Sequence, residues 1–247
     1  MAVSRTSWVG MGAALLIAGV LAAAAKAQQV IGSCRLESNV ACTNQDLSGA
    51  SLAGVNLEGG DLRGTSFARA ILQGANLLHA DLRTADLSGT DLSGANLSQA
   101  NLNTANFQGA NASRADFRHA NLSGANLSDA KLSRADVTGA IAIGAVFKRA
   151  TMEQTILVTA NLSGADLTNV NLASADLQRA NLSRVDFEGA HLRRANLTGA
   201  SLVGANLAGA DLTGAVVDGV DLHEAKLNRA IWTDGRRCAP GSVGECR

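Results

Sequence analysis

Residues 85–104 read ADLSG TDLSG ANLSQ ANLNT, and five-residue words of this kind fill most of the chain. From Leu47 to Trp232 every fifth residue is apolar, without insertion or deletion, which gives 38 words in register. The central position is Leu in 27 words, and all five Phe of the chain stand there too. The residue two before it is Ala 29 times, and the residue just before it is Asp or Asn 25 times. A fixed period of this kind indicates a repeat architecture.

A period of five fits neither a helix nor a flat strand. Steps of five residues turn an α-helix by about 140°, so the Leu side chains do not collect on one face. On a flat strand, odd spacing sends successive Leu side chains to opposite sides. The backbone must therefore bend once in each word, with Gly or another small or polar residue at the bend. Ala and Leu, two residues apart, then point the same way.

The words resemble those of the pentapeptide-repeat family, whose consensus is A(D/N)Lxx, across residues 45–234. The resemblance implies an all-β fold, a right-handed quadrilateral β-helix in which four words make one coil. The array then has about nine to ten coils and a length of about 45 Å at the usual strand spacing. In that family the central residue and the small residue two before it face inward, which leaves no room for a ligand cavity. The core positions implied include Leu97, Phe107, Phe117, Phe147, Leu177, Phe187 and Trp232, the last of which closes the final coil.

Residues 1–27 have the pattern of a secretory signal peptide. Arg5 precedes an apolar run from Val9 to Ala25, and small residues allow cleavage after Ala27. A retained membrane anchor is one alternative, because the run approaches the length of a short spanning helix. A lipoprotein attached through Cys34 is another, although this Cys lies well past the run. We expect cleavage, no membrane attachment afterwards, and a periplasmic or secreted protein (in the thylakoid lumen if the source is a cyanobacterium).

All four Cys lie outside the repeat, in two pairs that are each spaced by eight residues. An even number of Cys in an exported chain favours disulfides. Because the rod implied by the resemblance holds its ends about 45 Å apart, we expect the bonds Cys34–Cys42 and Cys238–Cys246. These bonds would close an N-terminal cap (28–44) and a C-terminal cap (235–247) that shield unpaired strand edges. A zinc site is disfavoured, because the spacing is too wide for a zinc knuckle.

One coil departs from the consensus, because residues 140–159 place apolar or β-branched residues where Asp or Asn is usual. Contiguous exposed apolar side chains usually mark a contact surface. The alternative is neutral drift, since β-branched residues suit the outer face of a strand. The candidate partner surface comprises Ile141, Ile143, Val146, Ile156 and Val158.

A basic cluster is a weaker candidate. Arg114 and Arg134 stand four words apart and therefore on one face, beside Lys131, but acidic residues share that face. Binding of an anionic lipid or glycan is one interpretation, and a solvated surface is the other. His79 and His119 share a face but lie about two coils, or roughly 10 Å, apart. That separation is too large for both to bind one metal ion.

The charge balance excludes a strongly basic nucleic-acid-binding face. The chain has 21 basic and 21 acidic residues, and loss of Arg5 and Lys26 with the signal peptide leaves a net charge of about −2. The chain also lacks the phosphate-loop and nucleophile-elbow motifs of common enzymes. We therefore expect no catalytic site, no cofactor and no metal, and no nucleic acid as a partner.

The expected function is that of an exported, non-enzymatic structural or protein-interaction rod, monomeric or homodimeric, whose protein partner the sequence does not name. The resemblance also implies an alternative, because the family includes DNA mimics that bind DNA gyrase and confer quinolone resistance. Near-neutral charge, an array without loops and an export signal count against that alternative here.

Overall fold

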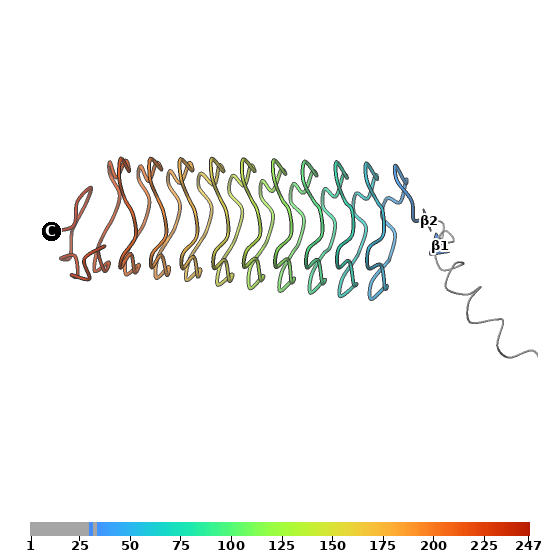
Figure 1. Ribbon diagram of the computed structural model, residues 1–247, viewed down its shortest axis with the longest axis horizontal. Helices are drawn as coiled ribbons and strands as arrows, with labels where there is room; N and C mark the ends of the chain where they lie inside the picture. The colour runs from blue at the N-terminus through green and yellow to red at the C-terminus, as the bar shows by residue number, and fades with distance from the viewer. Residues whose placement is uncertain (1–29, 32–33) are drawn as a thin grey trace, which may run out of the picture.

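The computed structural model describes residues 30–31 and 34–247. Two short strands, β1 (Val30–Ile31) and β2 (Cys34–Arg35), pair antiparallel at the N-terminal end. Beyond them the chain winds into a stack of similar coils, and Figure 1 shows an elongated rod with the C-terminus at the far end. The predicted signal peptide, residues 1–27, lies outside the described residues. Within the described part, no helix is long and apolar enough to cross a membrane.

Each coil pairs with the next through residues that are twenty positions apart. Parallel bridges run from Ala41↔Asp61 to Asp211↔Ile231, always with this separation, so four words complete one coil. The amide of a central residue donates to the carbonyl of the coil that follows, as Leu97 N does to Asp116 O at 2.7 Å. Backbone hydrogen bonds between successive coils therefore replace the ladders of a conventional sheet.

Each word also makes a β-turn of its own. The amide of Ala100 donates back to the carbonyl of Leu97 at 3.1 Å, and the residue before it, Gln99, has φ 57°. Among the words from Gly49 to Arg229, Gly holds this positive-φ position 18 times and another residue 19 times. The second residue of this turn has negative φ and the third has positive φ, which matches a type II turn. The positive φ explains why Gly is frequent at the third position.

The Asp or Asn before the central residue accepts a second local hydrogen bond. Oδ1 of Asn121 accepts the amide of Ser123 at 3.1 Å, and Oδ1 of Asp211 accepts that of Thr213 at 2.9 Å. This is the Asx-turn geometry that Asp and Asn favour, and it explains their dominance at the position.

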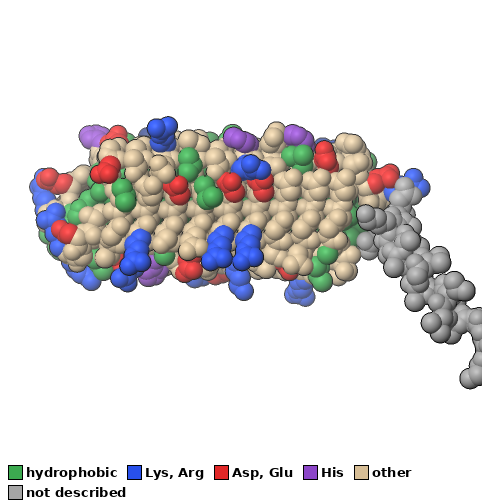
Figure 2. All heavy atoms as spheres, viewed as in Figure 1, with side chains coloured by type: hydrophobic (Ala, Val, Ile, Leu, Met, Phe, Trp, Pro, Cys, Tyr) green, Lys and Arg blue, Asp and Glu red, His purple; other side chains and the backbone are tan. Residues whose placement is uncertain are grey.

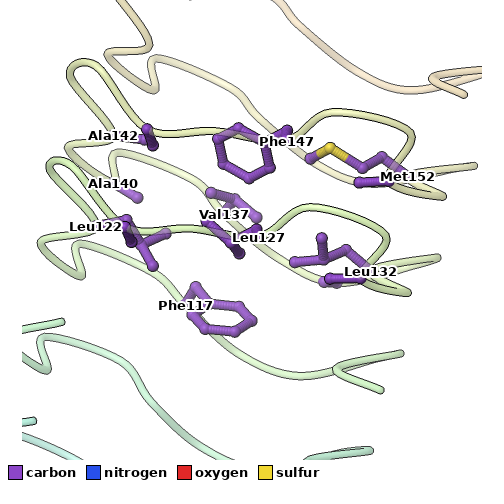
Figure 3. Close-up of a cluster of buried hydrophobic side chains, with 14 of the residues drawn as sticks. Phe117, Leu122, Leu127, Leu132, Val137, Ala140, Ala142, Phe147 and Met152 are labelled. Atoms are coloured by element: carbon purple, nitrogen blue, oxygen red, sulfur yellow. The ribbon is translucent and has the colours of Figure 1, made fainter. Parts of the chain in front are cut away.

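The axis of the rod is filled with side chains. Figure 3 shows those of one coil facing the axis beneath those of the next, with Phe117 and Leu122 among the lower set and Phe147 and Met152 among the upper set. All four are 0% exposed. Of the core positions implied by the sequence, six are fully buried: Leu97, Phe107, Phe117, Phe147, Leu177 and Phe187.

Trp232 departs from the expectation that it closes the final coil. Its side chain is only partly buried, and its amide donates to the carbonyl of Arg236 in the chain that follows. The chain turns at Gly235, where φ is 85°, and folds back over this word as a short segment that leaves the indole partly exposed.

Pairing between coils begins before residue 45: Asn39 N donates to Glu58 O at 2.6 Å, and the first bridged word is 40–44. Ala41 already pairs with Asp61, and Asn44 has the positive φ of the turn position, 54°. Cys42 holds the central position of this word, 1% exposed, and forms a disulfide with Cys34. The N-terminal disulfide is therefore anchored in the core of the first coil. At the other end Cys238 pairs with Cys246.

Candidate interaction surface

The candidate partner surface lies on the outer wall of the coil formed by residues 140–159. Ile141 and Ile143 are each 45% exposed and Ile156 is 41% exposed. Val146 and Val158 are half-buried. The side chains project outward because the Ala and central residues between them face the axis. The five residues Ile141, Ile143, Val146, Ile156 and Val158 are called the apolar band below.

The apolar band extends around the rod rather than forming one flat patch. Ile141 stacks between Asn121 and Asn161, so it shares their face. Ile156 lies one word before Asn161, which places Ile156 on the adjacent face. Figure 2 shows that hydrophobic side chains on the visible wall are surrounded by polar and charged ones. Val146 lies one word after Ile141, on the face at its other side, so the apolar band spans three of the four faces.

The coil that carries the apolar band lacks a local hydrogen bond that words with Asp or Asn before the central residue make. One coil before and one coil after, the amides of Ser123 and Ser163 donate to Asn121 and Asn161, each at 3.1 Å. Ile143 lies between them, and its amide has no hydrogen-bond partner among the described residues, because Ile141 offers no oxygen. The amides of Lys148 and Val158 lack a partner among the described residues for the same reason, and that of Glu153 lacks one although Thr151 carries a hydroxyl.

Loss of these bonds brings no packing in return. The Ile side chains project to solvent, and the core beneath them is as fully buried as elsewhere, with Ala142 and Phe147 at 0% exposure. A local rule that is broken without a structural gain is typical of a functional surface.

A groove of about 580 Å³ runs along the wall and ends at this coil, where Glu153 and Gln154 line it. Of the predicted basic cluster, the groove brings together Arg114 and Arg134, and it does not include Lys131. Nε of Arg134 donates to Oε1 of Gln154 at 2.8 Å, so part of its charge-bearing edge is occupied. The groove is thus lined by polar residues, and the hydrogen bond between Arg134 and Gln154 lies across it.

Aspartates near the N-terminal end of the array are paired with arginines. Arg63 lies 2.7 Å from Asp61 and 3.8 Å from Asp81, and Arg83 lies 2.6 Å from Asp81. The hydrogen bond from Arg83 holds the pKa of Asp81 below its ordinary value, and that from Arg63 does the same for the pKa of Asp61. This part of the wall alternates in charge instead of presenting a continuous negative stripe.

Metal ligation has no support in the described part of the chain. It contains no group of three or more His, Cys, Asp or Glu side chains placed to hold a metal ion. His79 and His119 occupy the same turn position on one face, with Gln99 between them.

Comparison with known proteins was made by sequence and by structure. A family model described as pentapeptide repeats, with eight copies, matches residues 38–65, 50–89, 85–124, 120–157, 155–194 and 190–229. A search of curated proteins finds no match.

Several solved structures resemble the chain. HetL, a pentapeptide repeat protein involved in heterocyst differentiation regulation in the cyanobacterium Nostoc, is 29% identical over 90% of this chain and 98% of its own, with a TM-score of 0.44. A pentapeptide repeat protein of the Arabidopsis thaliana thylakoid lumen is 32% identical over 40% of this chain and 63% of its own, with a TM-score of 0.31. QnrB1, a plasmid-mediated fluoroquinolone resistance protein, is 20% identical over 78% of this chain and 91% of its own, with a TM-score of 0.30.

Proposed function

Because this chain belongs to the pentapeptide-repeat family, we propose that it is an exported, non-enzymatic interaction rod that holds a protein partner on its outer wall. In the form proposed, the rod is a right-handed quadrilateral β-helix of about nine to ten coils, counted from its 38 words. The filled axis supports this function, because the central side chains of the interior coils are at most 1% exposed. Binding then falls to the outer wall, where contacts of a repeat protein are usually made.

The apolar band is the proposed contact, and it carries the proposal. Three Ile side chains stand 41–45% exposed on one coil. Desolvation of β-branched side chains on a rigid wall favours association without an ordering cost in the rod. The polar residues in the coils before and after the band, such as Asn121 and Asn161, would form the rim of such an interface.

Two features support the proposal that the protein is exported: the disulfide at each end of the rod and the signal-like sequence of residues 1–27. Disulfides Cys34–Cys42 and Cys238–Cys246 suit an oxidising compartment such as the periplasm or the thylakoid lumen. The apolar run from Val9 to Ala25 is typical of a cleaved export signal. Fractionation of cells that express the C-terminally tagged full chain tests this part, with the tagged protein expected outside the cytoplasm. A cytoplasmic product would instead favour the DNA-mimic alternative, which a gyrase supercoiling assay tests directly.

Partner binding is tested by comparing two variants that remove exposed Ile. The variant Ile141→Asn/Ile143→Asn/Ile156→Asn removes the band, and Ile71→Asn removes a similarly exposed Ile (44%) elsewhere on the wall. Each is crosslinked in intact cells and recovered under denaturing conditions. A protein that crosslinks to the wild type and to Ile71→Asn, and is lost with the triple variant, supports the proposal.

The opposite result is equally clear. Equal recovery of the same partners by all three proteins would show that the band does not bind them. Unfolding curves of the three purified rods provide the control, because the substitutions lie outside the core and should leave the transition nearly unchanged.

A further inference from the structure

The C-terminal end of the rod is covered over only half of its last coil. After Gly235 the chain folds back over the last two words, with antiparallel bridges Lys226↔Val243 and Ile231↔Arg237. Among the described residues, no chain pairs in this way with residues 216–224. The end is therefore a step, with a raised half formed by residues 226–247 and a recessed half formed by 216–224. The step is one strand layer high, or about 4.8 Å.

The recessed half exposes residues that belong to the core. Val217 and Leu222 hold central positions, yet both are only partly buried. Leu197 and Leu202, directly before them in the preceding coil, are 0% exposed. Val220, at the usual Ala position, is also only partly buried. The expected C-terminal cap therefore shields the apolar interior on one side only.

The recessed half also presents unpaired amides. In the coil before it, Leu197 N donates to Val216 O and Gly199 N donates to Asp218 O, both at 2.8 Å. The corresponding amides of the last coil have no hydrogen-bond partner among the described residues, since no carbonyl lies beyond them. They belong to Val217, Gly219, Leu222 and Glu224.

The raised half presents the complementary edge. Leu227 N donates to Ser242 O and Gly244 N donates to Ala225 O, both at 2.9 Å. In an antiparallel pair, a residue flanked by such bonds turns its own amide and carbonyl to the other side. Val243 therefore points its backbone groups away from the coil. Arg237 does the same, because Trp232 N and Cys238 N make the flanking bonds.

The two halves carry opposite charge. The recessed half has three acidic residues and no Lys or Arg, whereas the raised half has five basic and two acidic residues. Figure 2 shows hydrophobic, acidic and basic side chains close together at this end of the rod. The acidic residues of the recessed half are Asp218, Asp221 and Glu224, and the basic residues of the raised half are Lys226, Arg229, Arg236, Arg237 and Arg247.

We propose that the step is a self-complementary interface through which two copies of this chain pair end to end. A twofold axis perpendicular to the rod, along the edge of the step, seats each raised half in the recess of the other copy. The free amides at Val217 and Leu222 then face the open edge at Arg237 and Val243 of the second copy. The side chains of Val217 and Leu222 lose contact with water. The acidic residues of each recessed half meet the basic residues of the other copy's raised half.

This interface is separate from the apolar band and does not depend on the proposed partner. The end of a single coil is smaller than a standard interface of about 800 Å² per partner. We therefore expect a reversible dimer that dissociates on dilution and, because its charges are exposed, at high salt.

Charge reversal tests the pairing. One variant carries Asp218→Lys and Glu224→Lys, the other Lys226→Glu and Arg229→Glu, and all four side chains are exposed. Light scattering of the purified oxidised protein should give a dimer for the wild type and a monomer for each variant. An equimolar mixture of the two variants should again give a dimer, because both contacts become complementary. Glu188→Lys, in the middle of the rod, is the control and should remain dimeric.

Small-angle X-ray scattering supplies the geometry, since end-to-end pairing should nearly double the maximum dimension. A wild-type protein that stays monomeric at high concentration and low salt would overturn the proposal. So would a dimer that persists in both reversed variants, or one whose maximum dimension equals that of a single rod. The triple Asn variant of the apolar band should keep the dimer, which separates this result from the proposed partner binding.

Discussion

Phe107 and Phe117 meet edge to face inside one coil, with ring centroids 6.0 Å apart and ring planes at 70°. They stand two words apart, on opposite faces, and the word between them has Ala112 at the central position where Leu is usual. Two large rings and one small side chain thus fill the space that Leu residues fill in most coils. Size is balanced within a coil because the interior is close-packed.

Ala112→Leu should therefore destabilise the rod. The added side chain has no space beside the two rings, and overpacking of this kind costs about 1–3 kcal/mol. Denaturant unfolding followed by circular dichroism measures the loss. The same substitution in a Phe107→Leu background, where the coil regains space, should cost clearly less. An equal loss in both backgrounds would contradict the size compensation.

Two Leu→Ala substitutions, one on the axis and one on the wall, test which side chains face inward. Leu177 is a fully buried central residue, whereas Leu78 follows a central residue and lies half-buried on the wall. We expect Leu177→Ala to reduce the free energy of unfolding by about 2–5 kcal/mol through the cavity it leaves. Leu78→Ala should cost far less. Similar losses for the two variants would be incompatible with the inward and outward assignment.

Adding one methyl group at the positive-φ position of a turn should lower the stability of the rod. Gly164 has φ +67°, and a Cβ there would meet nothing within 4 Å, so the cost of Gly164→Ala comes from the backbone alone. A left-handed conformation costs an L-residue about 1–2 kcal/mol, and we expect a loss in that range on thermal unfolding. Ser163→Ala, at the neighbouring turn residue without a positive φ, is the matched control. A neutral Gly164→Ala would show that the turn tolerates a side chain freely.

The rod should lose stability in acid, in part through Asp81. Its hydrogen bond with Arg83 lowers the pKa of Asp81 in the folded state, so the carboxylate stabilises the fold above its ordinary pKa. That contribution disappears as the pH falls below about 4 and through the lowered folded pKa. Asp81→Asn and Arg83→Gln should each flatten the decline in the unfolding midpoint between about pH 4 and pH 2. An unchanged decline in both variants would show that this pair contributes nothing to it.

The periodic part of the fold was predictable, because each word repeats the same local requirements. The bend in each word, with Gly there, follows from the period, and the family resemblance implied the inward Leu and Phe and the corner Ala. Exceptions within the period required the structure. Thr90 and Thr155 replace Ala, and their hydroxyls donate to the carbonyls of Phe67 and Leu132 at 2.7 and 2.9 Å. A buried Thr looks unfavourable in sequence until its acceptor is known.

The ends were less predictable because nothing there repeats. The even number of Cys and the length of the implied rod indicated the two disulfide loops, but not that Cys42 is a core residue or that Trp232 is left partly open. The outward direction of Ile141 followed from its place in the word. The missing hydrogen bond at Ile143 became visible only when Asn121 and Asn161 were seen to cap equivalent amides. Where the chain folds back over the last coil depends on contacts after Gly235, which have no counterpart in the repeat.

Site-specific photocrosslinking in intact cells tests the central claim, that the apolar band binds a protein partner after export. A photoreactive phenylalanine analogue replaces Ile143 in one version and Ile71 in the other, two positions of nearly equal exposure, 45% and 44%. We expect a discrete crosslinked species at position 143, formed outside the cytoplasm and absent at position 71. The same pattern at both positions, or no crosslink at position 143, would contradict it.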